Sequence, residues 1–366
     1  MRVLVVNAGS SSLKLRVLDG GEVLIGGCDL PAEAGRVEER VLRDALARLP
    51  APDAVGHRVV HGGGRAAPAR IGPELVRELA TLAALAPLHQ PAALAIADAV
   101  GRLLPEAPAV ACFDTAFHAR LPPAAATYAL PRGWRARWPL RRYGFHGLSH
   151  AHVSRRAAEM LGWAGGELRI VSCHLGAGAS LCAIAGGRSV DTTMGFTPVE
   201  GLVMATRPGD VDPGLLLWLL RGGRLDLDAL EDGLVHDSGL MGLCGTADMR
   251  AVLERAGAGD AEARLALDVY VRRLRAGIAA MATALGGLDA LVFTGGAGER
   301  APALRERACA GLGLLGVRLD RRRNAVAAAD ADIGADAAPV RTLVVAARED
   351  LEIARGVRSA LGVSGR

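Results

Sequence analysis

Apolar residues recur along the chain with spacings that predict an alternation of strands and helices. Short β-branched or alternating runs predict strands at residues 3–6, 13–18, 109–113, 168–173, 181–184 and 290–293. Helical spacing predicts helices at residues 37–49, 73–85, 92–104, 261–285, 301–312 and 350–361. Pro73 and Pro91 stand where a first helical turn would begin, a position that proline favours. The pattern predicts an α/β protein.

The opening of this pattern returns in the second half of the chain. Residues 3–18 read as strand, small-residue loop and strand, and residues 168–184 repeat that order around a Gly-rich loop. A third strand with a Gly loop lies at 290–298. With 366 residues the chain is also longer than one ordinary core requires. We therefore expect two duplicated α/β domains flanking a cleft, the default place for a ligand.

Composition narrows the class of protein. Hydrophobic residues make up 51% and charged residues 22%, which is typical of a folded globular enzyme. The net charge is only +4, and the basic run at 132–142 is better explained as a solvated loop than as a binding patch, so nucleic acid is not an expected partner. The six cysteines form no CxxC pair, which favours reduced thiols in a cytoplasmic protein. No signal peptide or membrane span of about 18 apolar residues is expected.

The chain has a single lysine, Lys14, although 43 of its residues are basic. It ends the segment Asn7-Ala8-Gly9-Ser10-Ser11-Ser12-Leu13-Lys14, which directly follows a predicted strand. Gly9 permits a tight turn, hydroxyls such as those of Ser10 and Ser12 are donors for phosphate, and Lys14 adds a compact positive charge. Asn7 could hold a metal ion or a phosphate oxygen. The spacing is not that of a Walker A loop, and a plain hairpin turn is the alternative.

Two further Gly-rich loops follow predicted strands. The first is His174-Leu175-Gly176-Ala177-Gly178 and the second is Gly295-Gly296-Ala297-Gly298-Glu299. Each alone is only a turn signal, and three unrelated turns remain the alternative. Together with the first loop they predict a nucleotide gripped from two sides.

Four charged or titratable residues stand in settings that suit chemistry on anions. Arg58 and Arg207 lie in loops, and a guanidinium fork matches both a carboxylate and a phosphoryl group, although either arginine alone would more often form a surface salt bridge. Asp114 follows an apolar strand. His146 stands beside glycines, where it is placed to donate to developing charge.

Taken in chain order, the segment Val6–Lys14, the Arg58 loop, Asp114, the segment Tyr143–His150 and the Arg207 loop resemble the acetate kinase (acetokinase) family. The resemblance covers nearly the whole chain. It implies an actin/hexokinase/Hsp70-like (ribonuclease H-like) fold of two duplicated α/β domains in a homodimer. The N-terminal domain would comprise residues 1–118 and 352–366, and the nucleotide-binding C-terminal domain residues 119–351.

The resemblance also implies roles for individual residues. Asn7 and Glu349 would position Mg²⁺, with Mn²⁺ as an alternative. Arg58 would bind the carboxylate, while Arg207 and His146 would stabilise the transferring phosphoryl group. Because a carboxylate nucleophile is already ionised at neutral pH, Asp114 is expected to orient these groups and not to act as an acid or base. The pocket for the methyl group would comprise Val60, Leu88, Phe145 and Pro198. ATP or ADP would be held by Lys14, Ser10, Ser12, His174, Leu175, Gly176, Ala177, Gly178, Asp248, Met249, Arg250, Gly296, Ala297, Gly298, Glu299 and Arg300.

The implied reaction is reversible in-line transfer of the ATP γ-phosphoryl group to acetate, giving acetyl phosphate and ADP. A propionate or butyrate kinase is one alternative, although the loop Asn7-Ala8-Gly9-Ser10 differs from the Asn-Pro-Gly-Ser that is typical of butyrate kinases. A slow or non-catalytic ATP-binding protein of the same fold is another. That second alternative is motivated by departures from the family pattern at Ala177, Pro208, Arg300 and Arg348.

Overall fold

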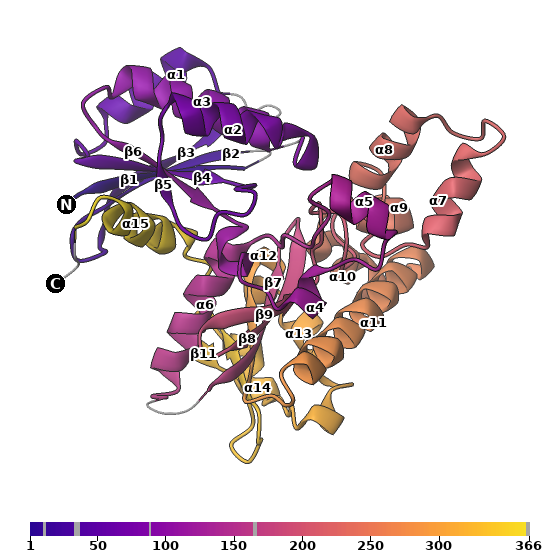
Figure 1. The fold of residues 1–366 in the computed structure, drawn as a ribbon. Coiled ribbons are helices and arrows are strands. Elements are labelled where there is room, and N and C mark those ends of the chain that lie inside the picture. The colour runs from indigo at the N-terminus through magenta and orange to yellow at the C-terminus, as the bar shows by residue number, and fades with distance from the viewer. Residues whose placement is uncertain (10–11, 33–36, 88, 164–166, 364–366) are drawn as a thin grey trace. The chain divides into compact units, whose positions relative to one another are not determined.

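The structure is a computed structural model that describes residues 1–9, 12–32, 37–87, 89–163 and 167–363 (Figure 1). Contacts within the chain divide it into two compact units. The first unit contains Met1–Arg120, Phe145–His152 and Arg348–Arg366, and the second contains Leu121–Gly144 and Val153–Ala347. From the sequence we expected domain boundaries after residues 118 and 351. That division remains a prediction.

The first unit is built on a six-stranded sheet in the order β3-β2-β1-β4-β6-β5. The first three strands are antiparallel neighbours, β4 and β6 run parallel to β1, and the short β5 is antiparallel to β6. The bounds are β1 Val3–Ala8, β2 Ser12–Leu18, β3 Leu24–Pro31, β4 Ala54–Val59, β5 Ala69–Arg70 and β6 Ala109–Phe113.

Helices cover both faces of this sheet because the strand β1 is apolar on both sides. Leu4 and Val6 share a core cluster with residues of α1 (Glu39–Ala47) and α3 (Gln90–Leu103). Val3 and Val5 instead pack with residues of α15 (Glu349–Ala360). Figure 1 shows α1, α2 (Pro73–Thr81) and α3 on one side of the sheet and α15 on the other. A strand buried on both faces reads as a continuous apolar run, which is how Val3–Val6 reads in the sequence.

The second unit repeats this plan. Its sheet has the order β11-β12-β10-β7-β8-β9. Here β7, β8 and β9 are antiparallel neighbours, β10 and β12 run parallel to β7, and β11 is antiparallel to β12. The duplicated α/β fold class is therefore confirmed. The bounds are β7 Arg169–Leu175, β8 Ala179–Ala185, β9 Arg188–Thr192, β10 Ala290–Thr294, β11 Ala331–Asp332 and β12 Arg341–Val344.

The remaining helices include several that the apolar pattern does not predict. The predicted helix 301–312 begins instead at Pro302, and the expected Gly loop before it forms a short helix, Gly295–Arg300. Gly295 has a positive φ of 78°, which starts this helix sharply after the strand β10. The helices are α4 Pro123–Ala126, α5 Arg132–Arg137, α6 Gly147–Met160, α7 Pro213–Leu220, α8 Leu227–Val235, α9 Gly239–Cys244, α10 Met249–Gly257, α11 Ala261–Ala284, α12 Gly295–Arg300, α13 Pro302–Cys309 and α14 Arg321–Val326, with 3₁₀ turns at Ala83–Leu85, Ala116–His118 and Gly313–Leu315. None of the helices in the described part of the chain combines the length and the apolar character that crossing a bilayer requires.

Candidate active site

Arg58 and Asp114 form a buried ion pair at one edge of the first sheet. They come together because β4 and β6 are parallel neighbours, and Arg58 lies near the end of β4 while Asp114 directly follows β6. The guanidinium of Arg58 donates through Nε and Nη2 to the carboxylate, with an Nη2–Oδ2 distance of 2.6 Å. Asp114 is only 1% exposed. Burial raises the pKa of Asp114 and the charge of Arg58 opposes that shift, while Asp114 and Glu349 raise the pKa of Arg58 against the effect of its own burial.

Asn7 and Glu349 extend this pair into a cluster of four polar side chains. Asn7 lies near the end of β1, and Glu349 is the first residue of α15. Arg58 Nη1 donates to Asn7 Oδ1 at 3.2 Å, and Asn7 Nδ2 donates to Glu349 Oε2 at 2.8 Å. Arg58 Nε lies 3.9 Å from the same Glu349 oxygen. The cluster thus joins four segments of the chain. It contains one positive group, two negative groups and one neutral amide.

The oxygen donors of this cluster fit a hard divalent cation in part. Magnesium is commonly held by one or two carboxylates, with its other positions filled by water and by phosphate oxygens of the substrate. Glu349 offers a carboxylate, and the Asn7 amide lies next to it, with its Nδ2 bonded to Glu349 Oε2 and its Oδ1 accepting from Arg58 Nη1. Among the described residues, no group of three or more His, Cys, Asp or Glu side chains could hold a metal ion by itself. The donor set therefore fits an ion that phosphate completes, and not a closed structural metal site.

The strand that follows the first turn lies where it was predicted. Gly9 N donates to Ser12 O at 2.9 Å, and β2 begins at Ser12, one residue before its predicted start. Lys14 lies within that strand. Its side chain is exposed and stands directly opposite Asn7 in the antiparallel register, hence on the same face of the sheet. Ser10 lies outside the described residues.

Phe145, His146 and Gly147 are fixed against Asp114 by their backbone. Gly147 N donates to Asp114 O at 2.8 Å, and a Cβ on Gly147 would stand 2.2 Å from that oxygen, so only glycine fits. His146 has a φ of 57°, an unfavourable value for a residue with a side chain. Such strain persists only where the surroundings impose it, and it gathers at functional sites. The Phe145 carbonyl is hydrogen-bonded to His118 Nε2 at 3.0 Å.

The predicted methyl pocket is only partly within the first unit. Val60 and Phe145 are buried there, at 4% and 1% exposed, and Phe145 meets the His61 ring edge-on. Pro198 belongs to the second unit, and Leu88 lies outside the described residues. Gln90, which sequence reasoning missed, is fully buried and clamps the His61 backbone: its Oε1 accepts from His61 N, and its Nε2 donates to His61 O. The only sign of Gln90 in the sequence was that it is a single amide side chain in an otherwise apolar stretch.

Three buried histidines of the first unit are expected to make the free energy of unfolding depend on pH. Burial lowers the pKa of His57, His61 and His118 to about 4. As pH falls from about 6.5 towards 4, the unfolded chain binds protons that the folded chain does not. We therefore expect the free energy of unfolding to fall by up to about 1.4 kcal/mol per pH unit for each histidine. Urea denaturation between pH 7 and 5 measures the slope, and His57→Gln should reduce it. A slope that this substitution leaves unchanged would contradict the prediction.

The second unit contains a cavity of about 610 Å³ at the β7–β8 turn, α10 and α12. The predicted nucleotide-binding residues that line it are Gly176, Ala177, Asp248, Met249, Arg250, Gly296, Ala297 and Arg300. Asp248 caps α10, with its Oδ1 accepting from Arg250 N. Two of the three Gly-rich segments thus meet at one hollow, whereas the first belongs to the other unit.

The predicted nucleotide residues of the second unit that are not part of this cavity's lining are His174, Leu175, Gly178, Gly298 and Glu299. His174 and Leu175 end β7, and Gly176 N donates to Gly178 O to close the turn. Glu299 Oε1 accepts from two backbone N–H groups, those of Gly295 and Ala347, so its carboxylate anchors the start of α12. Their contact with a nucleotide remains a prediction.

Arg305 anchors the other end of α12. It is 1% exposed, and its Nη1 donates to Gly298 O at 2.9 Å and to Glu299 O at 2.7 Å. Its Nε and Nη2 donate to the side chain and the carbonyl of Asn324. A buried arginine without a carboxylate partner is unusual, and in a chain rich in exposed arginines the sequence carries no sign of it.

Arg305→Ala is expected to lower the free energy of unfolding by about 3 kcal/mol or more, because several buried acceptors lose their donors at once. Arg307→Ala is the matched control, since Arg307 lies on the same helix but is exposed and makes only a 3.4 Å ion pair with Asp268. Urea denaturation of the two variants measures the difference. Equal, small losses would contradict the prediction.

Arg207 is a partly buried cation without an acidic partner among the described residues. Its Nη1 donates to Pro198 O at 2.6 Å, and burial lowers its pKa to about 10, which still leaves it charged at neutral pH. A neutral carbonyl orients the guanidinium without cancelling its charge. The remaining donors suit an incoming anion.

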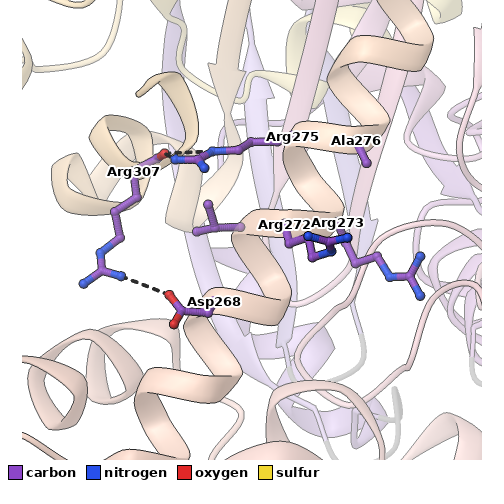
Figure 2. A pocket seen from close by; sticks show the side chains of 7 residues that line it. Asp268, Arg272, Arg273, Arg275, Ala276 and Arg307 are labelled. Atoms are coloured by element: carbon purple, nitrogen blue, oxygen red, sulfur yellow. Dashed lines mark hydrogen bonds and ion pairs between the residues drawn. The ribbon is translucent and has the colours of Figure 1, made fainter. Parts of the chain in front are cut away.

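A second hollow in this unit, of about 650 Å³, lies against α11 and α13. Figure 2 shows that its arginines do not converge. Arg275 donates to the backbone oxygen of Arg307, and Arg307 pairs with Asp268, while Arg273 extends away from Arg307. It contains none of the predicted site residues, so the cavity at α12 is the candidate nucleotide site.

Comparison with known proteins shows the family of this chain. The model of the acetokinase family matches residues 36–355. The chain belongs to the acetokinase family. It is 48% identical to an acetate kinase of Leifsonia xyli subsp. xyli, over 96% of this chain and 97% of that protein.

Solved structures of the acetokinase family share the fold. An acetate kinase of Porphyromonas gingivalis is 34% identical, with a TM-score of 0.88 over 98% of this chain and 99% of that one. A propionate kinase of Francisella tularensis subsp. tularensis is 33% identical, with a TM-score of 0.89 over 97% and 98%. Two departures from the family pattern, Ala177 and Arg300, line the α12 cavity. A third, Arg348, pairs with Asp350.

Proposed function

We propose that this chain is an acetate kinase, which transfers the γ-phosphoryl group of ATP reversibly to acetate to give acetyl phosphate and ADP. The proposal is carried by the cluster of Arg58, Asp114, Asn7 and Glu349, assembled from four segments in a chain of the acetokinase family. The names of its relatives support the same reaction.

Arg58 binds the carboxylate of acetate. Its Nε and Nη2 face Asp114, while Nη1 donates only to the neutral amide of Asn7 among the bonds found. Asp114 therefore fixes the plane of the guanidinium and leaves one edge for the acid. Acetate is ionised at neutral pH, so the nucleophile needs no base and Asp114 serves to orient.

Arg207 and His146 offset the negative charge that develops on the equatorial oxygens of the transferring phosphoryl group. The cavity at α12 and the amine of Lys14 hold ATP or ADP. Asn7 and Glu349 would hold Mg²⁺, or Mn²⁺, which when bound would offset the negative charge of the nucleotide phosphates. Catalysis by these residues is positioning and charge neutralisation.

Acetate is the preferred acid, and propionate is accepted as well. Val60 and Phe145 are buried apolar side chains suited to a methyl group. One added methylene changes discrimination by only about 1–3 kcal/mol in an apolar pocket, and one of the similar solved structures is a propionate kinase.

The experiment is a hydroxylamine-trapping assay with ATP, Mg²⁺ and acetate, propionate or butyrate, run beside the reverse assay with acetyl phosphate and ADP. We expect acyl hydroxamate with acetate above the other acids. Tight ATP binding with no turnover of any acid would replace the proposal with that of a non-catalytic ATP-binding protein.

We also propose a homodimer formed through α7. None of its residues is buried, and Leu217 and Trp218 are about half exposed, at 52% and 53%. An apolar helix left bare in this way favours a partner surface. Sedimentation equilibrium should give a dimer that Leu217→Asp dissociates.

All six cysteines are free thiols, which suits the cytoplasm as the compartment.

A further inference from the structure

Glu200 is the centre of a polar cluster in the second unit. Arg142 Nη2 donates to its Oε1 at 2.6 Å, and the Tyr128 hydroxyl donates to its Oε2. Burial and the neighbouring Glu200 carboxylate raise the pKa of Tyr128, so the phenol stays a donor. The Arg142 guanidinium also lies 5.5 Å from the Tyr128 ring centroid. The charge of Glu200 is thereby offset by Arg142 within the cluster.

The cluster is packed directly on the turn at residues 193–198. Arg142 Nη1 donates to Thr193 O at 3.0 Å, and Phe196 N donates to the Tyr128 hydroxyl at 2.8 Å. A Cβ on Gly195 would stand 1.6 Å from a Glu200 carboxylate oxygen and 2.1 Å from the Tyr128 hydroxyl, so no side chain fits there. The same groups that hold Glu200 therefore hold the backbone of this turn.

The turn at residues 193–198 also holds Arg207. Pro198 stands two residues before Glu200, and its carbonyl accepts the 2.6 Å hydrogen bond from Arg207 Nη1. The segment that carries Glu200 is also joined to the segment that carries Arg207. Gly201 N donates to Asp210 Oδ1 at 2.8 Å, and Asp210 N donates to Gly201 O at 3.0 Å. Among the described residues, the Pro198 oxygen is the acceptor found for the Arg207 guanidinium.

We propose that Glu200, held by Arg142 and Tyr128, is the positioning residue for Arg207. It fixes the Pro198 carbonyl and, through it, the direction of the guanidinium. A carboxylate bonded to Arg207 itself would orient that side chain but would neutralise it. In this cluster the Glu200 carboxylate bonds to Arg142 and Tyr128 and not to Arg207. Arg207 therefore keeps its positive charge for the phosphoryl group. This inference rests on the proposed function.

The first test compares Glu200→Gln with Asp289→Asn. Asp289 in the same unit also accepts hydrogen bonds at both carboxylate oxygens, from Arg169, and the hydrogen bonds found for it among the described residues involve no predicted site residue. We expect Glu200→Gln to lower kcat about tenfold to a hundredfold, as misplacement of a catalytic group does, with KM for ATP changed less than twofold. Asp289→Asn should leave kcat unchanged. Equal kcat in Glu200→Gln and wild type, or an equal loss in both variants, would overturn the inference.

The second test is a double-mutant cycle with Arg207→Ala. If Glu200 acts through Arg207, Glu200→Gln has no further effect on kcat once Arg207 is gone. Effects that multiply would overturn the inference. Tyr128→Phe, which removes one hydroxyl, is the second probe if Glu200→Gln does not fold, and it should show the same dependence on Arg207. A wild type inactive with every acid overturns the proposed function as well, whereas an active wild type with an unaffected Glu200→Gln overturns the inference alone.

Discussion

Replacing Arg207 with alanine is expected to lower kcat about a thousandfold, as removal of a charge aimed at a transition state does. The affinity for ATP should change by less than about threefold, because the cavity at α12 does not include Arg207. The reason for the large kcat effect is that the guanidinium is partly buried and lacks a carboxylate partner in the described chain, so its full charge is available. Single-turnover kinetics with hydroxylamine trapping and ATP titration measure the two quantities separately.

Arg224→Ala is the matched control, since Arg224 lies in the same unit and also donates to backbone carbonyls, those of Trp218 and Arg221, but is exposed. It should leave kcat unchanged. Arg207→Lys should recover only part of the activity, because an ammonium lacks the planar fork. A kcat for Arg207→Ala within tenfold of wild type, or a matching collapse of ATP affinity, would show that Arg207 has another task.

The places of the main elements follow from local patterns. Val3–Val6 reads as a buried strand because both of its faces are apolar, and α11 is predicted because its apolar spacing is long and regular. The position of Arg58 and Asp114 at strand ends was also predictable, because each follows an apolar run. That they face one another depends on the parallel pairing of β4 with β6, which no local pattern encodes.

What the sequence does not reveal are contacts between residues far apart in the chain. Gln90 reads as one polar residue of a helix until His61 is placed against it, 29 residues away. Arg305 reads as a surface arginine until α14 brings Asn324 to it. The cluster of Glu200 joins segments 58 and 72 residues distant, and no spacing rule covers such a distance. Lys14 falls within the strand predicted at residues 13–18, but its place opposite Asn7 depends on the pairing of β2 with β1.

Arg58→Ala is expected to have two large and separable effects. The first is a loss of at least a thousandfold in kcat/KM for acetate, because the buried fork that receives the carboxylate is gone. The second is a loss of about 3–5 kcal/mol in the free energy of unfolding, because Asp114 is left as a buried charge without its partner. Steady-state kinetics with varied acetate and urea denaturation measure them independently.

The pH dependence and a companion variant separate these effects. Without Arg58, burial and the charge of Glu349 both act to raise the pKa of Asp114, so in the folded variant it rises further above that of the unfolded chain. Such a group stabilises the fold below its unfolded pKa, and this stability is lost as pH rises through the folded pKa. The deficit of Arg58→Ala relative to wild type should therefore be larger at pH 8 than at pH 5. Adding Asp114→Asn removes the orphaned charge, so the double variant should regain stability without regaining activity. Recovery of both would mean that Arg58 serves the fold alone, and recovery of neither would mean that the buried charge is not the source of the instability.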